Sequence, residues 1–153
     1  MRELRRKDRE LGKDDAIDLL KKGEYGILST VDRDNNAYGV PMSYIYWNNA
    51  IYFHCALEGY KLDNIKNNAS ASFCVVGQTC VISEQFSTLY ESVIVSGIVE
   101  CISGDEKKGA LLEILNKYSK ENLESGKLHI ERAIGRVEVI KINIDRIVGK
   151  ARK

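Results

Sequence analysis

The stretch from Tyr90 to Ile102 constrains the fold most. Its sequence, YESVIVSGIVECI, predicts one unusually long strand. Gly97 stands near its middle, and a glycine inside a strand permits a sharp bend of the kind that barrels need at their corners. A long strand with such a bend favours a closed or nearly closed antiparallel barrel over a flat sandwich.

The rest of the chain predicts short strands joined by hairpin-length links, with three short helices between them. The expected strands are Tyr25–Val31, Tyr38–Trp47, Ile51–Cys55, Ala71–Val76, a short one at Cys80–Ile82, and Gly135–Ile144. The expected helices are Ala16–Lys22, Glu58–Asn67 and residues 104–118, with a polar loop over 119–127 and an irregular or briefly helical piece over Leu128–Ala133. These elements predict one β-rich domain, all-β or α+β, that spans residues 1–153 and begins with a polar arm over residues 1–13.

Charge and cysteine content argue against several classes of function. The 153 residues include 23 Lys and Arg against 22 Asp and Glu, so bulk electrostatics gives no argument for nucleic acid or an anionic membrane. No run approaches the roughly 18 apolar residues of a membrane span, and no secretory signal is recognised, so we expect a cytoplasmic protein. The four cysteines match no zinc spacing, so we expect free thiols and no metal site. Hydrolysis and nucleotide triphosphate chemistry have no support, since no Ser-His-Asp constellation and no Walker-type loop is recognised.

The expected strand Tyr38–Trp47 contains the only proline of the chain. Alternate residues of a strand point to opposite faces, so its residues divide into two sets. Pro41 and Ser43 share one side, and Val40, Met42 and Tyr44 share the other. A break in the hydrogen-bond ladder beside a small hydroxyl would let a flat ring lie along the backbone. The alternative is an ordinary edge strand whose proline prevents aggregation.

The segment from Ile51 to Asn67 reads as a strand that ends in polar groups and passes into a helix. His54 stands at the strand end, and Lys61 and Asn64 fall in the first turns of the helix. A strand end, a helix N-terminus and a lysine together suit a phosphate-bearing ligand. The plainer interpretations are a hydrogen-bonded histidine and a solvated lysine. Ser92, at the start of the long strand, could donate to a ligand phosphate or ring oxygen, or could be an ordinary strand residue.

Five motifs together resemble the pyridoxamine 5′-phosphate oxidase-related, FMN-binding split-barrel proteins, and most of all their 5-nitroimidazole-resistance branch. The motifs are YGILSTVD, YGVPMSYIYWNNAIYFHCALEGYKLDNIKNN, SFCVVG, YESVIVSG and GRVEVIKINIDRIVGKA. The resemblance covers roughly Lys7 to Ala151. It implies a six-stranded split β-barrel, a homodimer, and two FMN molecules (or FAD) at the dimer interface.

The resemblance also implies roles for particular residues. Val40, Pro41, Met42, Ser43 and Tyr44 would lie along the isoalloxazine ring. Phe53 and His54 would stand near the flavin, with His54 as the catalytic group on the substrate side. Lys61 would bind the phosphate with Tyr60 beside it, Asn64 belongs to the same joint, and Ser92 would approach from the long strand. Arg132 and the Gly135–Arg136 region would approach from the partner subunit.

The resemblance therefore predicts a dimeric FMN-dependent oxidoreductase that takes electrons from NAD(P)H or another reductant and reduces a small aromatic or nitro-bearing acceptor. One departure argues against vitamin B6 oxidation: Tyr60-Lys61 replaces an Arg-Lys pair of the true oxidases, and their C-terminal Arg-containing substrate motif is not recognised. Three alternatives stay open. They are a flavin-binding sensor or carrier without turnover, a haem-binding split barrel with His54 or His129 on the iron, and a small nucleic-acid module.

Overall fold

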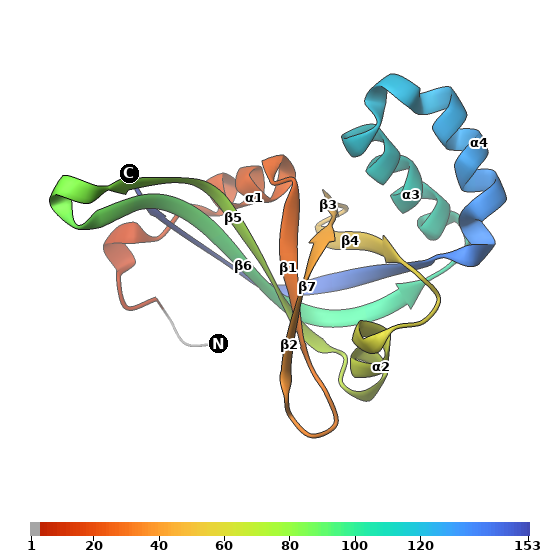
Figure 1. Cartoon of the computed structure of the whole chain (residues 1–153), viewed down its shortest axis with the longest axis horizontal. Coiled ribbons are helices and arrows are strands. Elements are labelled where there is room, and N and C mark those ends of the chain that lie inside the picture. The colour runs from red at the N-terminus through yellow and green to blue at the C-terminus, as the bar shows by residue number, and fades with distance from the viewer. Residues whose placement is uncertain (1–3) are drawn as a thin grey trace.

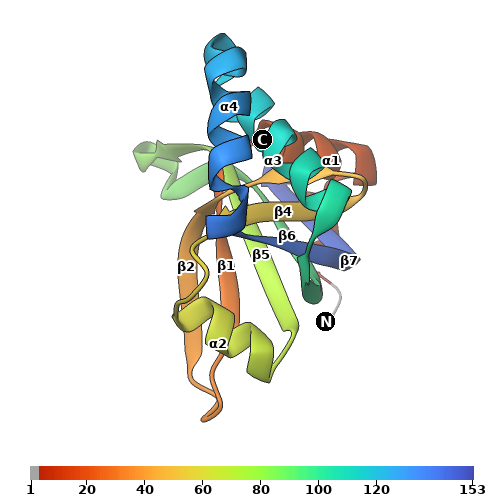
Figure 2. The same ribbon diagram turned by 90° about the vertical axis from the view of Figure 1, so that its right-hand side faces the viewer.

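A computed structural model describes residues 4–153, which fold around a seven-stranded antiparallel sheet (Figure 1). The strands are β1 (Tyr25–Val31), β2 (Ala37–Ser43), β3 (Ile45–Trp47), β4 (Ala50–Cys55), β5 (Ser70–Ile82), β6 (Ser87–Ile102) and β7 (Glu138–Arg152). They lie in the order β2-β1-β5-β6-β7-β4-β3. The α-helices of this part of the chain are α1 (Lys13–Lys22), α2 (Tyr60–Asn67), α3 (Gly104–Tyr118) and α4 (Leu123–Ala133). Figure 2 shows α2 at one end of the curved sheet and the α3–α4 pair at the other.

The two edge strands of the sheet, β2 and β3, are separated in the chain by a single residue, Tyr44. The sheet therefore curls until its two edges meet at Tyr44, although β2 and β3 are not neighbours in the hydrogen-bonded order. We call this junction the seam. The expected split barrel is confirmed, with seven strands instead of six, because the expected strand Tyr38–Trp47 is divided at Tyr44.

The long strand β6 bends at Gly97 as expected, where its register against β7 shifts between Ser96 and Gly97. A Cβ atom at Gly97 would lie 1.9 Å from the carbonyl oxygen of Asn143, so only glycine lets β7 approach this closely. β5 likewise joins the two strands expected at 71–76 and 80–82 across a bulge between Val76 and Thr79.

The interior consists of two apolar clusters of buried side chains. The larger one fills the barrel and includes Leu20 of α1 together with Leu62 and Ile65 of α2. The smaller one lies under α3, which contributes Leu111 and Ile114. Full burial of one such side chain is worth roughly 1.5–3 kcal/mol, so these contacts fix the helices on the barrel.

α3 occupies the residues expected, whereas α1 begins at Lys13 instead of Ala16, α2 begins at Tyr60 instead of Glu58, and β7 runs on to Arg152. The expected loop over 119–127 is wrong, because α4 begins at Leu123. α4 buries none of its own side chains and packs on α3, where a Cβ at Gly126 would lie 2.2 Å from the Leu115 side chain. A helix that depends on a neighbouring helix leaves only a weak signal in its own sequence.

The polar arm lies against the barrel over its described part. The Leu11 N–H donates to the carbonyl oxygen of Gly149 (3.0 Å), and Glu10 forms an isolated bridge with Lys150. Residues 1–3 of the expected arm lie outside the described residues. Among the helices of residues 4–153, none combines the length and the apolar character that crossing a membrane requires.

Candidate functional site

At the seam, two consecutive side chains of α3 hold the backbone of Tyr44. Lys117 Nζ donates to the carbonyl oxygens of Gly23 (2.6 Å) and Tyr44 (3.0 Å) and stands 4.2 Å from the centroid of the Tyr44 ring. The Tyr118 hydroxyl accepts a hydrogen bond from the Tyr44 N–H (2.9 Å). The Tyr44 hydroxyl donates to the Leu20 carbonyl (2.6 Å). These side-chain contacts satisfy backbone groups that have no ladder partner at the break.

Burial governs the ionisation of this cluster. It lowers the pKa of Lys117 to about 8 and raises the pKa of Tyr118. At pH 7 Lys117 is therefore still cationic, so its contacts with two carbonyl oxygens and the Tyr44 ring are charge-assisted.

A pocket of about 660 Å³ opens between the seam and the two helices, and we call it the α3–α4 pocket. Two residues that the sequence singled out, Ser43 and His54, lie on its barrel side. The remaining lining is mostly apolar and comes largely from α3, α4 and the turns beside them. It consists of Leu111, Ile114, Leu115, Tyr118, Ser119, Asn122, Ser125, Gly126, His129, Ile130, Ala133, Ile134 and Val137. Of the described residues that line this pocket, none is Asp, Glu, Lys or Arg.

His54 reaches the pocket from the end of β4, where it pairs with Val139 of β7. Desolvation by the surrounding protein lowers the pKa of His54, so its imidazole is neutral at pH 7. A neutral imidazole offers one N–H donor and one acceptor. His54 is thus suited to recognise an uncharged polar group in the pocket.

β2 is an edge strand that pairs with β1 on one side and, within residues 4–153, has no strand partner on the other. Val40 and Met42 pack against the larger core cluster, while Pro41 and Ser43 are exposed, as the alternation predicted. At about 3.4 Å per residue, β2 presents roughly 20 Å of free backbone edge. One end of this edge reaches Ser43 at the α3–α4 pocket.

The first turn of α2 lies beside the other end of β2. The Tyr60 hydroxyl donates to Asp32 in the β1–β2 turn (2.7 Å), and the Tyr60 ring stands edge-on to that of Tyr38 at 4.9 Å. Lys61 is half-buried and lies near Cys55. Burial raises the pKa of the Cys55 thiol, and the positive charge of Lys61 opposes that rise. The structure therefore places Tyr60 and Lys61 where β4, α2 and β2 approach one another.

Two other residues of the predicted site turn into the protein. Phe53 is fully buried and stacks on Phe73, with 6.4 Å between the ring centroids. Asn64 is 2% exposed, and its amide donates to the hydroxyl of Thr30 (3.1 Å). Both side chains hold elements together, so a cofactor at the surface could meet only the backbone of these residues.

Within one chain the structure does not bring Ser92 to this group. Ser92 pairs with Val76 of β5. Val76 lies six residues, or about 20 Å, from Ser70, where β5 begins after α2. Arg132 on α4 and Gly135 and Arg136 after it are all exposed. Their part in a site stays a prediction.

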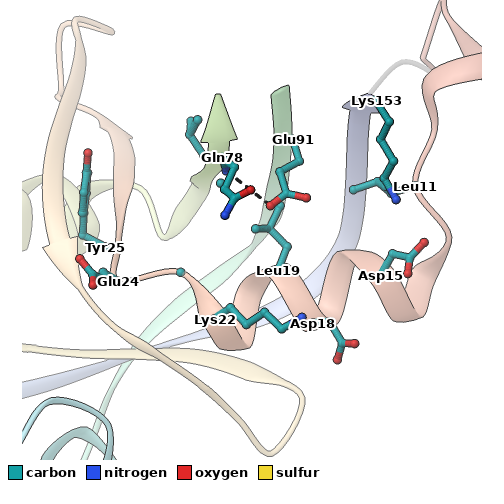
Figure 3. A pocket seen from close by; sticks show the side chains of 13 residues that line it. Leu11, Asp15, Asp18, Leu19, Lys22, Glu24, Tyr25, Gln78, Glu91 and Lys153 are labelled. Atoms are coloured by element: carbon teal, nitrogen blue, oxygen red, sulfur yellow. Dashed lines mark hydrogen bonds between the residues drawn. The ribbon is translucent and has the colours of Figure 1, made fainter. Parts of the chain in front are cut away.

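A second pocket, of about 680 Å³, lies between α1 and the bulge of β5 (Figure 3). Figure 3 shows Glu91 of β6 facing Gln78, whose backbone N–H donates to it (3.4 Å), and Asp15 on α1 with Lys153 nearby. None of the predicted site residues lines this pocket. Over residues 4–153, no group of three or more His, Cys, Asp or Glu side chains is placed to hold a metal ion.

Sequence reasoning missed two residues of the site, Lys117 and Tyr118. They end the expected helix over 104–118, but nothing in its periodicity indicates that they bind a strand break. His129 was named only as an alternative haem ligand, with no indication that it shares a pocket with His54. A usable signal was the spacing of Gly126, Ile130 and Ala133, which places small and apolar residues on one face of a helix.

Comparisons with known proteins agree with the split-barrel fold. A family model described as pyridoxamine 5′-phosphate oxidase matches residues 12–151. A search of curated proteins finds no match. Among solved structures, a proposed 5-nitroimidazole antibiotic resistance protein from Bacteroides thetaiotaomicron is 25% identical, with a TM-score of 0.79 over 93% of this chain and 86% of that one. A FAD and heme binding protein from Mycobacterium smegmatis (TM-score 0.83, covering 95% of this chain and 74% of that one) and a FAD-binding protein from Mesorhizobium loti (TM-score 0.66, covering 95% and 98%) are each 18% identical and share the fold.

Proposed function

Because the chain belongs to the pyridoxamine 5′-phosphate oxidase-like family, we propose that it is an oxidoreductase that holds FMN along the free edge of β2. The observation that carries this proposal is the position of that edge between two groups of suitable chemistry. Tyr60 and Lys61 at one end suit a phosphate, and Ser43 and His54 at the other border an apolar pocket. The edge of β2 between them is roughly 20 Å long, and the proposed flavin mononucleotide would extend along it.

The first turn of α2, the edge of β2 and His54 would each contact a different part of the flavin or its substrate. Lys61 and the backbone N–H groups of the first turn of α2 supply positive charge for the phosphate. The unpaired backbone groups from Val40 to Ser43 supply hydrogen bonds for the flat ring, which would take the place of a partner strand. When bound, the flavin supplies the electron transfer, and the protein supplies orientation and electrostatics. His54 is the neutral polar group on the substrate side.

We propose further that two copies pack through the outward face of the sheet. Directly paired residues form an apolar row across four strands on that face: Pro41 (β2), Ile27 (β1), Cys74 (β5) and Ile94 (β6). Ser92 lies on the same face as Ile94, so a second copy docked there would meet it. Ile94→Asp is expected to give a monomer by light scattering, whereas Thr88→Asp near the tip of the β5–β6 hairpin leaves the dimer intact.

NADH or NADPH is the proposed electron donor, and a small aromatic or nitro compound the acceptor. The described cysteines, Cys55, Cys74, Cys80 and Cys101, are all free thiols. Free thiols suit a reducing compartment, so we place the protein in the cytoplasm.

The absorbance spectrum of the purified protein, with mass spectrometry of the molecule that it releases on denaturation, tests the cofactor and separates FMN from FAD. A colourless protein that binds neither flavin would overturn the proposal. Oxidation of NADH or NADPH in the presence of nitrobenzene then separates an enzyme from a flavin sensor or carrier. His54→Ala is expected to slow acceptor reduction at least tenfold and to leave the flavin bound, with His54→Gln restoring part of the rate.

A haem-binding role is the second candidate, and one observation favours it. Both histidines of the chain, His54 and His129, line the same apolar pocket. Imidazole is a common axial ligand of haem iron. An intense Soret band in the purified protein, or its appearance on titration with hemin and its loss in His129→Ala, would establish this role.

A further inference from the structure

We infer that the α3–α4 pocket selects an uncharged, ring-sized acceptor, and that His129 on α4 is a specificity-determining residue that recognises it together with His54. This inference rests on the proposed function, since it treats the pocket beside Ser43 and His54 as the acceptor site. It adds to the proposed function a role for His129 and the preference for an uncharged acceptor.

The position of His129 is the first step. It comes from α4, while His54 comes from β4, yet both side chains line one pocket. The walls between them are largely aliphatic, from Leu111, Ile114 and Ile130 among others. A planar molecule held between these walls would have an imidazole on its barrel side and another on its helical side.

The absence of charge among the lining residues is the second step. A carboxylate or phosphate entering this pocket would lose its water and meet no lysine or arginine among the lining residues. The ammonium groups of Lys107 and Lys117 beside the pocket are engaged with backbone carbonyls, of Val137 (2.7 Å) and of Gly23 and Tyr44 respectively. The imidazoles of His54 and His129 and the hydroxyl of Ser43 offer donors, which suit the oxygen of a nitro or carbonyl group. The Tyr118 hydroxyl already donates to the carbonyl oxygen of Tyr44 (2.7 Å). The pocket therefore disfavours phosphorylated B6 vitamers and favours neutral aromatic acceptors.

The way α4 is attached is the third step. Its principal contacts are with α3 and with the turns that flank it, and it buries no side chain of its own. The close approach at Gly126 brings it against Leu115 and thereby sets one wall of the pocket. Of the α4 residues, Ile130 packs against the smaller core cluster, whereas His129 is exposed and can vary without disturbing that core.

Three probes with the same ring and nitro group test whether the pocket prefers uncharged acceptors: nitrobenzene, 4-nitrobenzoate and 4-nitrophenyl phosphate. The first measurement is NMR of the imidazole nitrogens in the full-length protein as purified. The chain has only two histidines, so each signal can be assigned from one variant. Nitrobenzene is expected to shift both signals, and the phosphate ester neither. Unshifted signals with nitrobenzene, or equal shifts with all three probes, would refute the inference.

The second measurement is the dissociation constant of nitrobenzene, from the change in flavin absorbance. His129→Phe keeps a ring of similar size and removes the donors, so we expect affinity to fall about five- to tenfold with the flavin dissociation constant unchanged. Glu131→Gln, on an exposed position of the same helix outside the pocket, is the matched control and should change neither constant. If His129→Phe binds nitrobenzene as tightly as the wild type, His129 has no such role. A protein without flavin would instead refute the proposed function, and the NMR titration would still decide the pocket.

Discussion

The ammonium nitrogen of Lys117 lies 3.0 Å from the carbonyl oxygen of Tyr44 and 4.2 Å from the centroid of its ring. Tyr44 is the single residue between the two edge strands of the sheet, so this contact joins the last turn of α3 to the seam of the barrel. Ser43, the residue before Tyr44, lines the α3–α4 pocket. The contact therefore ties the helix that walls the pocket to the strand proposed to hold the cofactor.

Lys117→Met is predicted to lower the free energy of unfolding at pH 7.5 by about 1–3 kcal/mol, because two carbonyl oxygens lose a charged donor. It should also change the pH dependence. Folded Lys117 releases its proton near pH 8 and the unfolded chain near 10.5, so the unfolded state binds more protons between these values and stability rises with pH there. The rise in stability with pH ends near pH 10, where tyrosines of the unfolded chain begin to release their protons. In the folded protein, Tyr44 and Tyr118 keep their protons at this pH because their pKa values are raised.

Urea unfolding at pH 7.5 and 9.5 measures this contribution. The wild type should gain stability between the two pH values relative to Lys117→Met. Lys108→Met, an exposed lysine of the same helix, is the control and should follow the wild type. Parallel pH profiles for the wild type and Lys117→Met would contradict the prediction.

Lys61→Ala is predicted to weaken FMN binding tenfold or more, because the phosphate loses a charged partner worth roughly 1.5–3 kcal/mol. Riboflavin lacks the phosphate, so its affinity should be unchanged in the same variant. Flavin fluorescence titrations measure both constants, with Lys66→Ala on the same helix as the control. Equal losses for FMN and riboflavin would place Lys61 elsewhere than at the phosphate.

Asn64→Ala is predicted to cost about 1–3 kcal/mol of stability, since the buried Thr30 hydroxyl loses its hydrogen-bond partner. A double-mutant cycle with Thr30→Ala should give a coupling energy of about 0.5–1.5 kcal/mol by urea denaturation. Flavin affinity should change little, because the Asn64 side chain faces β1. A loss of flavin affinity as large as that of Lys61→Ala would show that Asn64 contacts the cofactor.

Gly97→Ala is predicted to destabilise the protein by at least about 2 kcal/mol, or to prevent folding, because the added methyl group would collide with the Asn143 backbone. Gly39→Ala is the matched control in β2, where the nearest neighbour of the new Cβ is a side-chain methyl at 3.4 Å. It should fall within about 1 kcal/mol of the wild type. Thermal melts compare the two, and similar losses in both variants would contradict the argument from Gly97.

Much of the sheet was predictable from local signals. The strand Tyr25–Val31 was predicted at its observed bounds, and Gly97 marks the bend of β6. The β3–β4 hairpin turns at Asn48 and Asn49, because asparagine tolerates the positive φ angles of 46° and 58° found there. The candidate site was readable in part: Ser43, His54, Tyr60 and Lys61 lie where a bound flavin could meet them, whereas Phe53 and Asn64 face the interior.

The start of each strand, the bend of β6 and the residue types at the β4–α2 joint follow from the amino-acid sequence, because those features depend on neighbours a few residues away. The seam and the pocket arise only when distant segments of the chain pack together. The break at Tyr44 depends on Tyr118, 74 residues further along the chain. α4 packs on α3, and this packing makes His129 part of the same pocket as His54. Contacts over such separations follow from burial and hydrogen bonding in the folded chain, which no local pattern records.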